Sequence, residues 1–197
     1  MLQGRYIRLR AMTESDGEFV RTLRNSSCVR NQFLDRLLVS EQRQRRFLAS
    51  LADSESEFYL IAEVIESGKP FGVFFLRDIQ HRHQRAEAGV FCDDGADQGV
   101  PVFEGLYLLY DYAFNTLNLR KLVARVLKTN DRGMRLNRLV GMKEEGVFRD
   151  HVFGDGGFLD VVSWCLFRDD FNSRPSESMA FVRSGRHFDA NPEEESL

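Results

Sequence analysis

The segment from Phe91 to Phe114 constrains the fold most, because it joins the end of a strand, a polar turn and a strongly apolar helix. Gly95 and Gly99 make the turn flexible, and Pro101 has the fixed φ that suits the first turn of a helix. Apolar residues then recur at spacings of three and four, which predicts a buried helix from about Pro101: Phe103, Leu106, Tyr107, Tyr110, Ala113 and Phe114.

The start of this predicted helix is a candidate anion-binding site. The first turn of a helix has N–H groups without partners, and the helix dipole adds partial positive charge there. A strand–turn–helix junction of this kind can therefore bind a phosphate. An ordinary core helix after a tight turn would explain the same residues.

Composition excludes several classes of protein. The chain has 197 residues, 43% of them hydrophobic, which is enough for one domain with a substantial core. A formal net charge of −3, with basic residues spread along the chain, argues against nucleic acid as a partner. Three cysteines without a CxxC pair favour a reducing compartment, so we expect a cytoplasmic protein. No run approaches the roughly 18 apolar residues of a membrane span, so we expect neither a membrane segment nor a signal peptide.

The remaining elements follow from hydrophobic periodicity. Two predicted helices, 13–25 and 40–53, follow a first strand and precede a hairpin, and a second strand–helix–strand series follows the central helix. This order predicts a mixed α/β or α+β sheet. We expect a domain over residues 1–170 and a mobile polar tail over 171–197. The predicted strands are 5–10, 58–65, 71–76, 86–92, 121–126, 143–152 and 158–167, and the last helix is 131–139.

The order of these elements, together with three short motifs, resembles the GCN5-related N-acetyltransferase (GNAT) superfamily. The motifs are DYAFNTLNLRKL at 111–122, VLKTND at 126–131 and LVGMKEEG at 139–146. The resemblance covers roughly residues 5–170 and is greatest to the branch that acetylates ribosomal-protein alanine, spermidine and UDP-4-amino sugars. It implies a twisted, mostly antiparallel sheet flanked by helices. It also implies transfer of an acetyl group from acetyl-CoA to a primary amine, with no metal.

By this resemblance, the strand over 86–92 presents its backbone to the thioester and pantetheine, so Val90, Phe91 and Cys92 line the cofactor groove. The turn before the central helix would bind the pyrophosphate. In the family this turn is rich in glycine, whereas here Val100 and Val102, or in another register Pro101 and Phe103, occupy the small-residue positions. Either the turn binds CoA through a different set of N–H groups, or binding is weak. The expected contacts in the turn are Gln98, Gly99, Val100, Val102 and Phe103.

Two further cofactor contacts are expected at the start of helix 131–139. Asn130 matches an asparagine that contacts the pantetheine arm in the family, and it also suits a helix cap. Arg132 could meet CoA phosphates, although a surface arginine would look the same. In many relatives, the residue seven positions beyond this asparagine is a tyrosine that acts as the general acid and protonates the leaving thiolate. Here that position is Asn137, so we assign no general acid.

Catalysis needs a base, because an amine protonated at neutral pH cannot attack a thioester. Related acetyltransferases often carry a glutamate base where this chain has Glu87. The alternative is that Glu87 is an exposed strand glutamate in a salt bridge. His81 and His83 lie between arginines, which disfavours a metal site.

Acceptor recognition is expected between the first two helices. Arg24, Asn25 and Arg30 could contact diphosphate or sugar oxygens, and Phe33 could stack on a ring. These residues resemble the amino-sugar branch, so an amino-sugar nucleotide is the first expected acceptor. A protein N-terminus or a polyamine is the alternative, and a non-catalytic scaffold with a degenerate CoA turn is a third reading. A homodimer is compatible with the sequence, which does not determine the oligomeric state.

Overall fold

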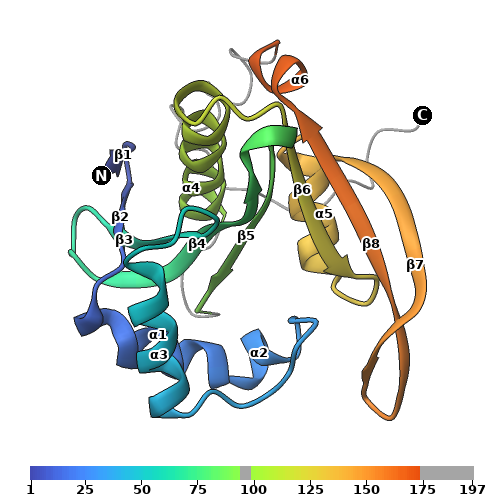
Figure 1. Ribbon diagram of the computed structural model, residues 1–197, viewed down its shortest axis with the longest axis horizontal. Helices are drawn as coiled ribbons and strands as arrows, with labels where there is room; N and C mark the ends of the chain where they lie inside the picture. Colours follow the sequence, from blue (N-terminus) through green and yellow to red (C-terminus); the bar gives the residue numbers. More distant parts are fainter. Residues whose placement is uncertain (94–98, 174–197) are drawn as a thin grey trace, which may run out of the picture.

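The computed structural model describes residues 1–93 and 99–173 and contains one eight-stranded sheet with helices on both faces (Figure 1). The strand order is β1-β2-β3-β4-β5-β6-β8-β7. Every neighbouring pair is antiparallel except β5 and β6, which are parallel. The predicted α+β fold with a mostly antiparallel sheet is therefore confirmed.

The N-terminal elements alternate between the sheet and one group of helices. Ile7 and Leu9 are fully buried, as their alternation with polar neighbours predicts. Ser40 caps the third helix by accepting a hydrogen bond from the Arg43 N–H at 3.2 Å. The elements are β1 (Leu2–Gln3), β2 (Ile7–Ala11), a 3-10 turn η1 (Glu14–Asp16), α1 (Gly17–Asn25), α2 (Ser27–Arg30) and α3 (Glu41–Leu51).

The next three strands form a meander: β3 (Phe58–Val64), β4 (Pro70–Gln80) and β5 (Arg85–Cys92), with a 3-10 turn η2 (His81–His83) before β5. Strand β4 continues four residues past the predicted end at Leu76. The prediction was short because the apolar run stops at Leu76, whereas pairing with β5 continues past it through a register irregularity between Arg77 and Gln80. Asp78 takes a positive φ of 49° inside that irregularity.

The C-terminal half contains the central helix and the last strands. Helix α4 begins at Val100, one residue before the predicted start, and ends in a π-helical turn. Asn130 caps α5, and Gly141 follows that helix with a φ of 82°. The elements are α4 (Val100–Asp111), η3 (Tyr112–Thr116), β6 (Lys121–Leu127), α5 (Asp131–Leu139), β7 (Lys143–Gly154), β8 (Gly157–Phe167) and α6 (Arg168–Asn172).

The sheet separates two hydrophobic clusters, because successive strand residues point to opposite faces. The larger cluster packs α4 and α5 against the sheet and includes Phe74, Leu106, Tyr110 and Trp164. The smaller cluster packs α1 and α2 against the other face and consists of Val20, Leu23, Val29, Ile61, Val73, Phe75 and Phe91. The indole of Trp164 on β8 is among the most deeply buried side chains of the larger cluster.

Helix α6 was not predicted. Phe171 packs its ring against Tyr107, Phe114 and Tyr110 at centroid distances of 5.0, 5.3 and 6.3 Å. The predicted domain boundary at residue 170 therefore falls inside an element that packs on α4. Residues 174–197 of the predicted tail lie outside the described part of the chain.

A buried carboxylate joins the N-terminus of the chain to the central helix. Glu104 on α4 is only 2% exposed and accepts backbone hydrogen bonds from Arg5, Tyr6 and Ile7 at 2.5, 2.9 and 3.0 Å. A side chain on Gly4 would collide with this carboxylate, since a Cβ there would lie 2.3 Å from it. Glu104 thus fixes the turn between β1 and β2 against α4.

We predict that Glu104→Ala lowers the free energy of unfolding by about 2–3 kcal/mol, because three N–H groups lose a charged acceptor. Glu104→Gln keeps one acceptor oxygen and should lose less. Glu66→Ala, at an exposed glutamate, is the control and should stay within about 0.5 kcal/mol of the wild type. Urea unfolding at neutral pH measures all three. Equal stability of Glu104→Ala and the control would contradict a structural role for this carboxylate.

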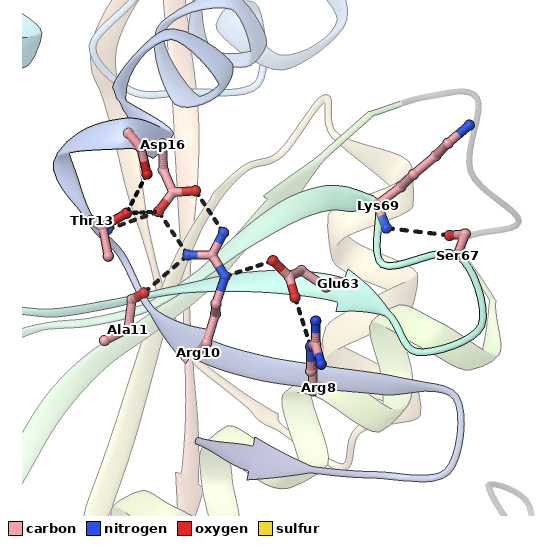
Figure 2. A network of polar contacts seen from close by, with 9 residues as sticks. Arg8, Arg10, Ala11, Thr13, Asp16, Glu63, Ser67 and Lys69 are labelled. Atoms are coloured by element: carbon pink, nitrogen blue, oxygen red, sulfur yellow. Dashed lines mark hydrogen bonds and ion pairs between the residues drawn. The ribbon is translucent and has the colours of Figure 1, made fainter.

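A second network of charges sets the direction in which α1 leaves the sheet (Figure 2). Arg10 on β2 donates to both oxygens of Asp16 at 2.7 Å and to Glu63 at 2.6 Å, and Arg8 donates to the other Glu63 oxygen at 2.7 Å. Thr13 donates its N–H and its hydroxyl to Asp16 at 2.8 Å. Burial alone would raise the pKa of Asp16, but the hydrogen bonds from Arg10 and Thr13 outweigh it and lower that pKa.

This lowered pKa predicts an acid-dependent loss of stability. The folded protein holds Asp16 ionised at pH values where the unfolded chain protonates it, so the stabilisation is present above about pH 4 and is lost as pH falls through the folded-state pKa. The difference in unfolding free energy between the wild type and Asp16→Asn should therefore shrink as the pH falls below about 4. A difference that stays constant with pH would show that Asp16 does not titrate differently in the two states.

Candidate active site

The parallel strands β5 and β6 separate part of the way along the sheet (Figure 1). Their ladder contains three residue pairs, Arg85↔Lys121, Ala86↔Leu122 and Glu87↔Val123. Beyond Glu87, β5 stays paired with β4 as far as Cys92, and β6 stays paired with β8 as far as Leu127. The facing edges therefore carry backbone groups that do not pair with each other within the described residues. An extended ligand with amide groups can pair with such an edge.

Three predicted contacts line this opening from β5, but they do not face the same way. Val90 and Cys92 are partly buried against the cluster under α4 and α5. Phe91 belongs to the cluster on the opposite face, because neighbouring strand residues alternate. The Phe91 side chain therefore borders the α1–α2 side of the opening rather than the α4 side.

The N-terminus of α4 follows the open end of β5 in the chain. Gly99 is its N-cap, and the Phe103 N–H donates to the Gly99 carbonyl at 3.2 Å. The side chains of Val102 and Phe103 are buried, at 3% and 8% exposure, and the Phe103 N–H is used within the helix, so neither side chain is available to a ligand. Pro101 has no N–H, which leaves the first turn one donor short. Gln98 and the rest of the turn from residue 94 lie outside the described residues.

The two predicted contacts on α5 differ in how firmly they are held. The Asn130 side chain accepts a hydrogen bond from the Gly133 N–H at 2.8 Å, so the predicted cap is present. Arg132 is exposed in the first turn of α5, directly after Asn130. This turn follows β6, the second strand of the opening, and its N–H groups add partial positive charge there.

Glu87 is the last residue of the β5–β6 ladder, where the strands begin to separate. Its carboxylate is 11% exposed, lies 2.5 Å from the Arg77 guanidinium and lies 3.9 Å from that of Arg125. Burial alone would lower the pKa of Arg77, but the hydrogen bond to Glu87 outweighs it and raises that pKa. The salt bridge of the alternative reading is therefore present, but Glu87 is not the exposed glutamate that this reading described. Arg77 occupies one carboxylate oxygen and Arg125 lies near the other, so two guanidinium groups compete with an amine for direct contact with Glu87.

The predicted acceptor residues separate into two groups. Asn25 forms two hydrogen bonds with the backbone of Val39, at 3.0 and 2.8 Å, and so fixes the segment before α3. Both ends of its amide are used in this contact, which gives Asn25 a structural role, and its predicted contact with substrate stays a prediction. Arg24 and Phe33, in contrast, lie together, with the guanidinium carbon 3.3 Å from the ring centroid. Arg30 ends α2 and is partly buried.

A row of aromatic rings that the sequence analysis did not identify crosses this face of the sheet. Phe33 contacts Phe91 at 5.3 Å, Phe91 contacts Phe75 at 6.4 Å, and Phe75 contacts Tyr59 at 5.4 Å. Gly89 allows the Phe75 ring to cover β5, since a Cβ there would lie 2.2 Å from that ring. Burial raises the pKa of Tyr59 to about 12, so this phenol stays neutral at physiological pH. Phe75 and Tyr59 occupy alternate positions of the two predicted hairpin strands, which places both rings on the same face as the smaller cluster, and this alternation was the available signal.

Two further features are missing from the described residues, 1–93 and 99–173. Within them, no group of three His, Cys, Asp or Glu residues is placed to hold a metal ion. No helix in this part of the chain is long and apolar enough to cross a membrane.

Comparisons with known proteins agree on the fold and on the family. Residues 7–143 match the family model described as an acetyltransferase (GNAT) domain. A spermidine N(1)-acetyltransferase of Escherichia coli K12 is 24% identical over 165 residues, which cover 84% of this chain and 88% of that protein.

Solved structures show the same architecture. The spermidine N-acetyltransferase of Vibrio cholerae in complex with CoA and spermine superposes with a TM-score of 0.78 at 20% identity, covering 85% of this chain and 98% of that one. A GCN5-related N-acetyltransferase of Brucella melitensis gives 0.77 at 18% identity, covering 92% of this chain and 84% of that one. At these identities the structural likeness shows the fold.

We predict that Glu87→Gln lowers the free energy of unfolding by about 1–2 kcal/mol, because a partly buried Arg77 loses its carboxylate partner. Thermal unfolding measures the change. Glu145→Gln is the matched control, since Glu145 pairs with Lys121 at a more exposed position and should matter less. Equal effects of the two substitutions would mean that the Arg77–Glu87 pair adds nothing beyond a surface ion pair.

Proposed function

The chain belongs to the acetyltransferase (GNAT) family, and we propose that it transfers the acetyl group of acetyl-CoA to a primary amine of a small molecule. Membership supports the expected enzyme class, an N-acetyltransferase, and acetyl-CoA as its co-substrate. The observation that carries the proposal is the opening between β5 and β6, which begins at Glu87. The cytoplasmic location and a homodimer stay predictions.

The opening suits the donor because pantetheine is an extended chain with amide groups. Its amides would pair with the β5 edge near Val90 and Cys92, and its diphosphate would lie at the N-terminus of α4. Asn130 and Arg132, on the turn after β6, would contact the arm and the phosphates. A backbone N–H on the separated part of β5 would stabilise the oxyanion that forms when the thioester carbonyl is attacked.

The altered turn weakens this arrangement without removing it. Gly99, Val100 and Val102 keep backbone N–H groups at the start of α4, whereas Pro101 supplies none. The helix dipole does not depend on the side chains and remains. We therefore expect acetyl-CoA to bind through fewer N–H groups than a glycine-rich turn would offer. A non-catalytic scaffold is the alternative that loss of binding would favour.

The amine would arrive from the α1–α2 side and meet the thioester where the ladder ends. The neutral amine attacks the thioester carbonyl, and collapse of the tetrahedral intermediate breaks the carbon–sulfur bond and releases the CoA thiolate. Glu87 would take the amine proton through a bridging water, since Arg77 occupies one of its oxygens. The thiolate is a good leaving group, and the amide of Asn137 cannot act as a general acid, so we assign none.

The comparisons change the order of the expected acceptors. The related proteins are named for spermidine, which favours a polyamine over the amino-sugar nucleotide expected first. A polyamine is therefore the first class to assay, and amines that also carry an anionic group are the second. The observation that favours the second class is the buried guanidinium of Arg24 beside Phe33, because it could pair with an anionic group.

We predict that acetyl-CoA at about a hundred times its dissociation constant stabilises the protein by about 2.7 kcal/mol. For a chain of this length the unfolding temperature should rise by roughly 5–10 °C. Differential scanning fluorimetry with acetyl-CoA, and with acetate as the control, measures the shift.

Two outcomes decide between the enzyme and the scaffold. A shift of this size, followed by release of free CoA thiol in the presence of an amine, supports the proposal. In that assay Glu87→Gln should lower kcat and leave the acetyl-CoA shift unchanged. No shift at millimolar acetyl-CoA would contradict the proposal and favour a scaffold that has lost its cofactor.

A further inference from the structure

Arg24 is a charged residue whose burial the protein does not compensate. The Nη1 atom is buried and has no hydrogen-bond partner among the described residues. The Nη2 atom donates to the backbone carbonyl of Asp35 at 3.2 Å, and the guanidinium carbon lies 3.3 Å from the centroid of the Phe33 ring. A buried donor without a partner on a charged group lowers the stability of the fold. This cost is offset when a bound ligand supplies the missing acceptor.

The other arginines near Arg24 have carboxylate partners. Arg77 pairs with Glu87 at 2.5 Å, and Arg43 pairs with Asp35 at 3.3 Å. Glu57 adds a further negative charge near Arg77, but Arg24 contacts no carboxylate in the described part of the chain. The pKa of Arg24 is lowered to about 10, mainly by burial; the charge of Asp35 opposes this shift, and the charges of Arg43 and Arg77 add to it.

The position of Arg24 connects it to the reaction site. Its ring partner Phe33 contacts Phe91, which lies on the part of β5 beyond the ladder. Arg77 covers Phe75, the next ring along, at 5.3 Å. Two guanidinium groups therefore lie over the aromatic row on the acceptor side of the opening, one on Phe33 and one on Phe75.

We propose that the acceptor carries an anionic group, a carboxylate or a phosphate, in addition to its primary amine, and that Arg24 together with Arg77 binds that group. The inference rests on the proposed N-acetyltransferase function and specifies its acceptor. A guanidinium suits either anion, because its N–H groups match the spacing of two oxygens. The same positive charges repel a polyamine, which carries several ammonium groups at neutral pH.

Binding requires a small movement of the cover over Arg24. Nη1 is buried and the guanidinium lies against the Phe33 ring, so we expect Phe33 to shift when an anion binds there. Phe33 lies in the irregular segment between α2 and α3, whose far end is fixed by the Asn25–Val39 contact. The anionic group thus replaces the aromatic cover of Arg24 by a charged partner.

The test uses acceptors matched except for the anionic group. Lysine is 1,5-diaminopentane with an added carboxylate, and O-phosphoethanolamine is ethanolamine with an added phosphate; spermidine is included as the polyamine. We expect kcat/KM for at least one anionic member to exceed that of its partner by about tenfold or more, and to exceed that of spermidine. The pair that shows the preference identifies the anion.

Substitutions then assign the preference to Arg24. Arg24→Met should lower kcat/KM for the anionic member about tenfold, mainly through KM, and raise it for the matched amine without the anionic group, which is a cation at neutral pH and is repelled by Arg24. Arg24→Lys should restore part of the preference. Arg21→Met removes the same charge from the exposed side of α1 and should leave the preference unchanged.

The unfolding temperature of Arg24→Met and the shift caused by acetyl-CoA distinguish an effect on folding from an effect on acceptor binding. Arg24→Met should unfold at the wild-type temperature or above, since it removes an uncompensated buried charge. Transfer to amines with no preference for the anionic members, or a preference that survives Arg24→Met, overturns the inference alone. Absence of transfer to every amine, together with no shift by acetyl-CoA, overturns the proposed function and the inference with it.

Discussion

The short parallel ladder between β5 and β6 is the constraint on which the rest of the structure depends. Three residue pairs join the two antiparallel halves of the sheet, and α4 forms the crossover that parallel pairing requires. Twist separates the strands after Glu87, so their facing edges lose their partners. Unpaired backbone groups at such a site are costly unless a ligand pairs with them. The feature that joins the sheet therefore also creates the opening in which we propose that acetyl-CoA binds.

The buried charges in this protein differ in how completely they are paired. Those that hold the fold together have all their partners within the protein, whereas the one that we propose binds the acceptor does not. Glu104 accepts three backbone N–H groups and holds the N-terminus on α4. Arg10 shares its donors between Asp16 and Glu63, which fixes the entry into α1. Both groups are satisfied within the protein and explain its shape. Arg24 is the contrasting case, with a buried donor and no carboxylate contact in the described residues.

Local patterns in the sequence were enough to predict most elements, and contacts between distant residues explain what was missed. Pro101 and the spacing of apolar residues predicted the start of α4 to within one residue, and Asn130 was recognised as a cap because capping is a local interaction. The sequence analysis did not identify Glu104, because its partners lie about a hundred positions away in an unremarkable turn. Arg77 was missed because only the register of β4 against β5 places it beside Glu87.

The same distinction separates the donor side of the site from the acceptor side. Acetyl-CoA is expected to meet mainly backbone groups of β5 and α4, which survive changes of side chain, and this is how Val100 and Val102 can replace small residues without removing the site. Acceptors are selected by side chains such as Arg24 and Phe33, which two proteins at 24% identity need not share. Family membership therefore constrains the chemistry of the donor strongly, while the identity of the acceptor has to be derived from the charges that this chain buries.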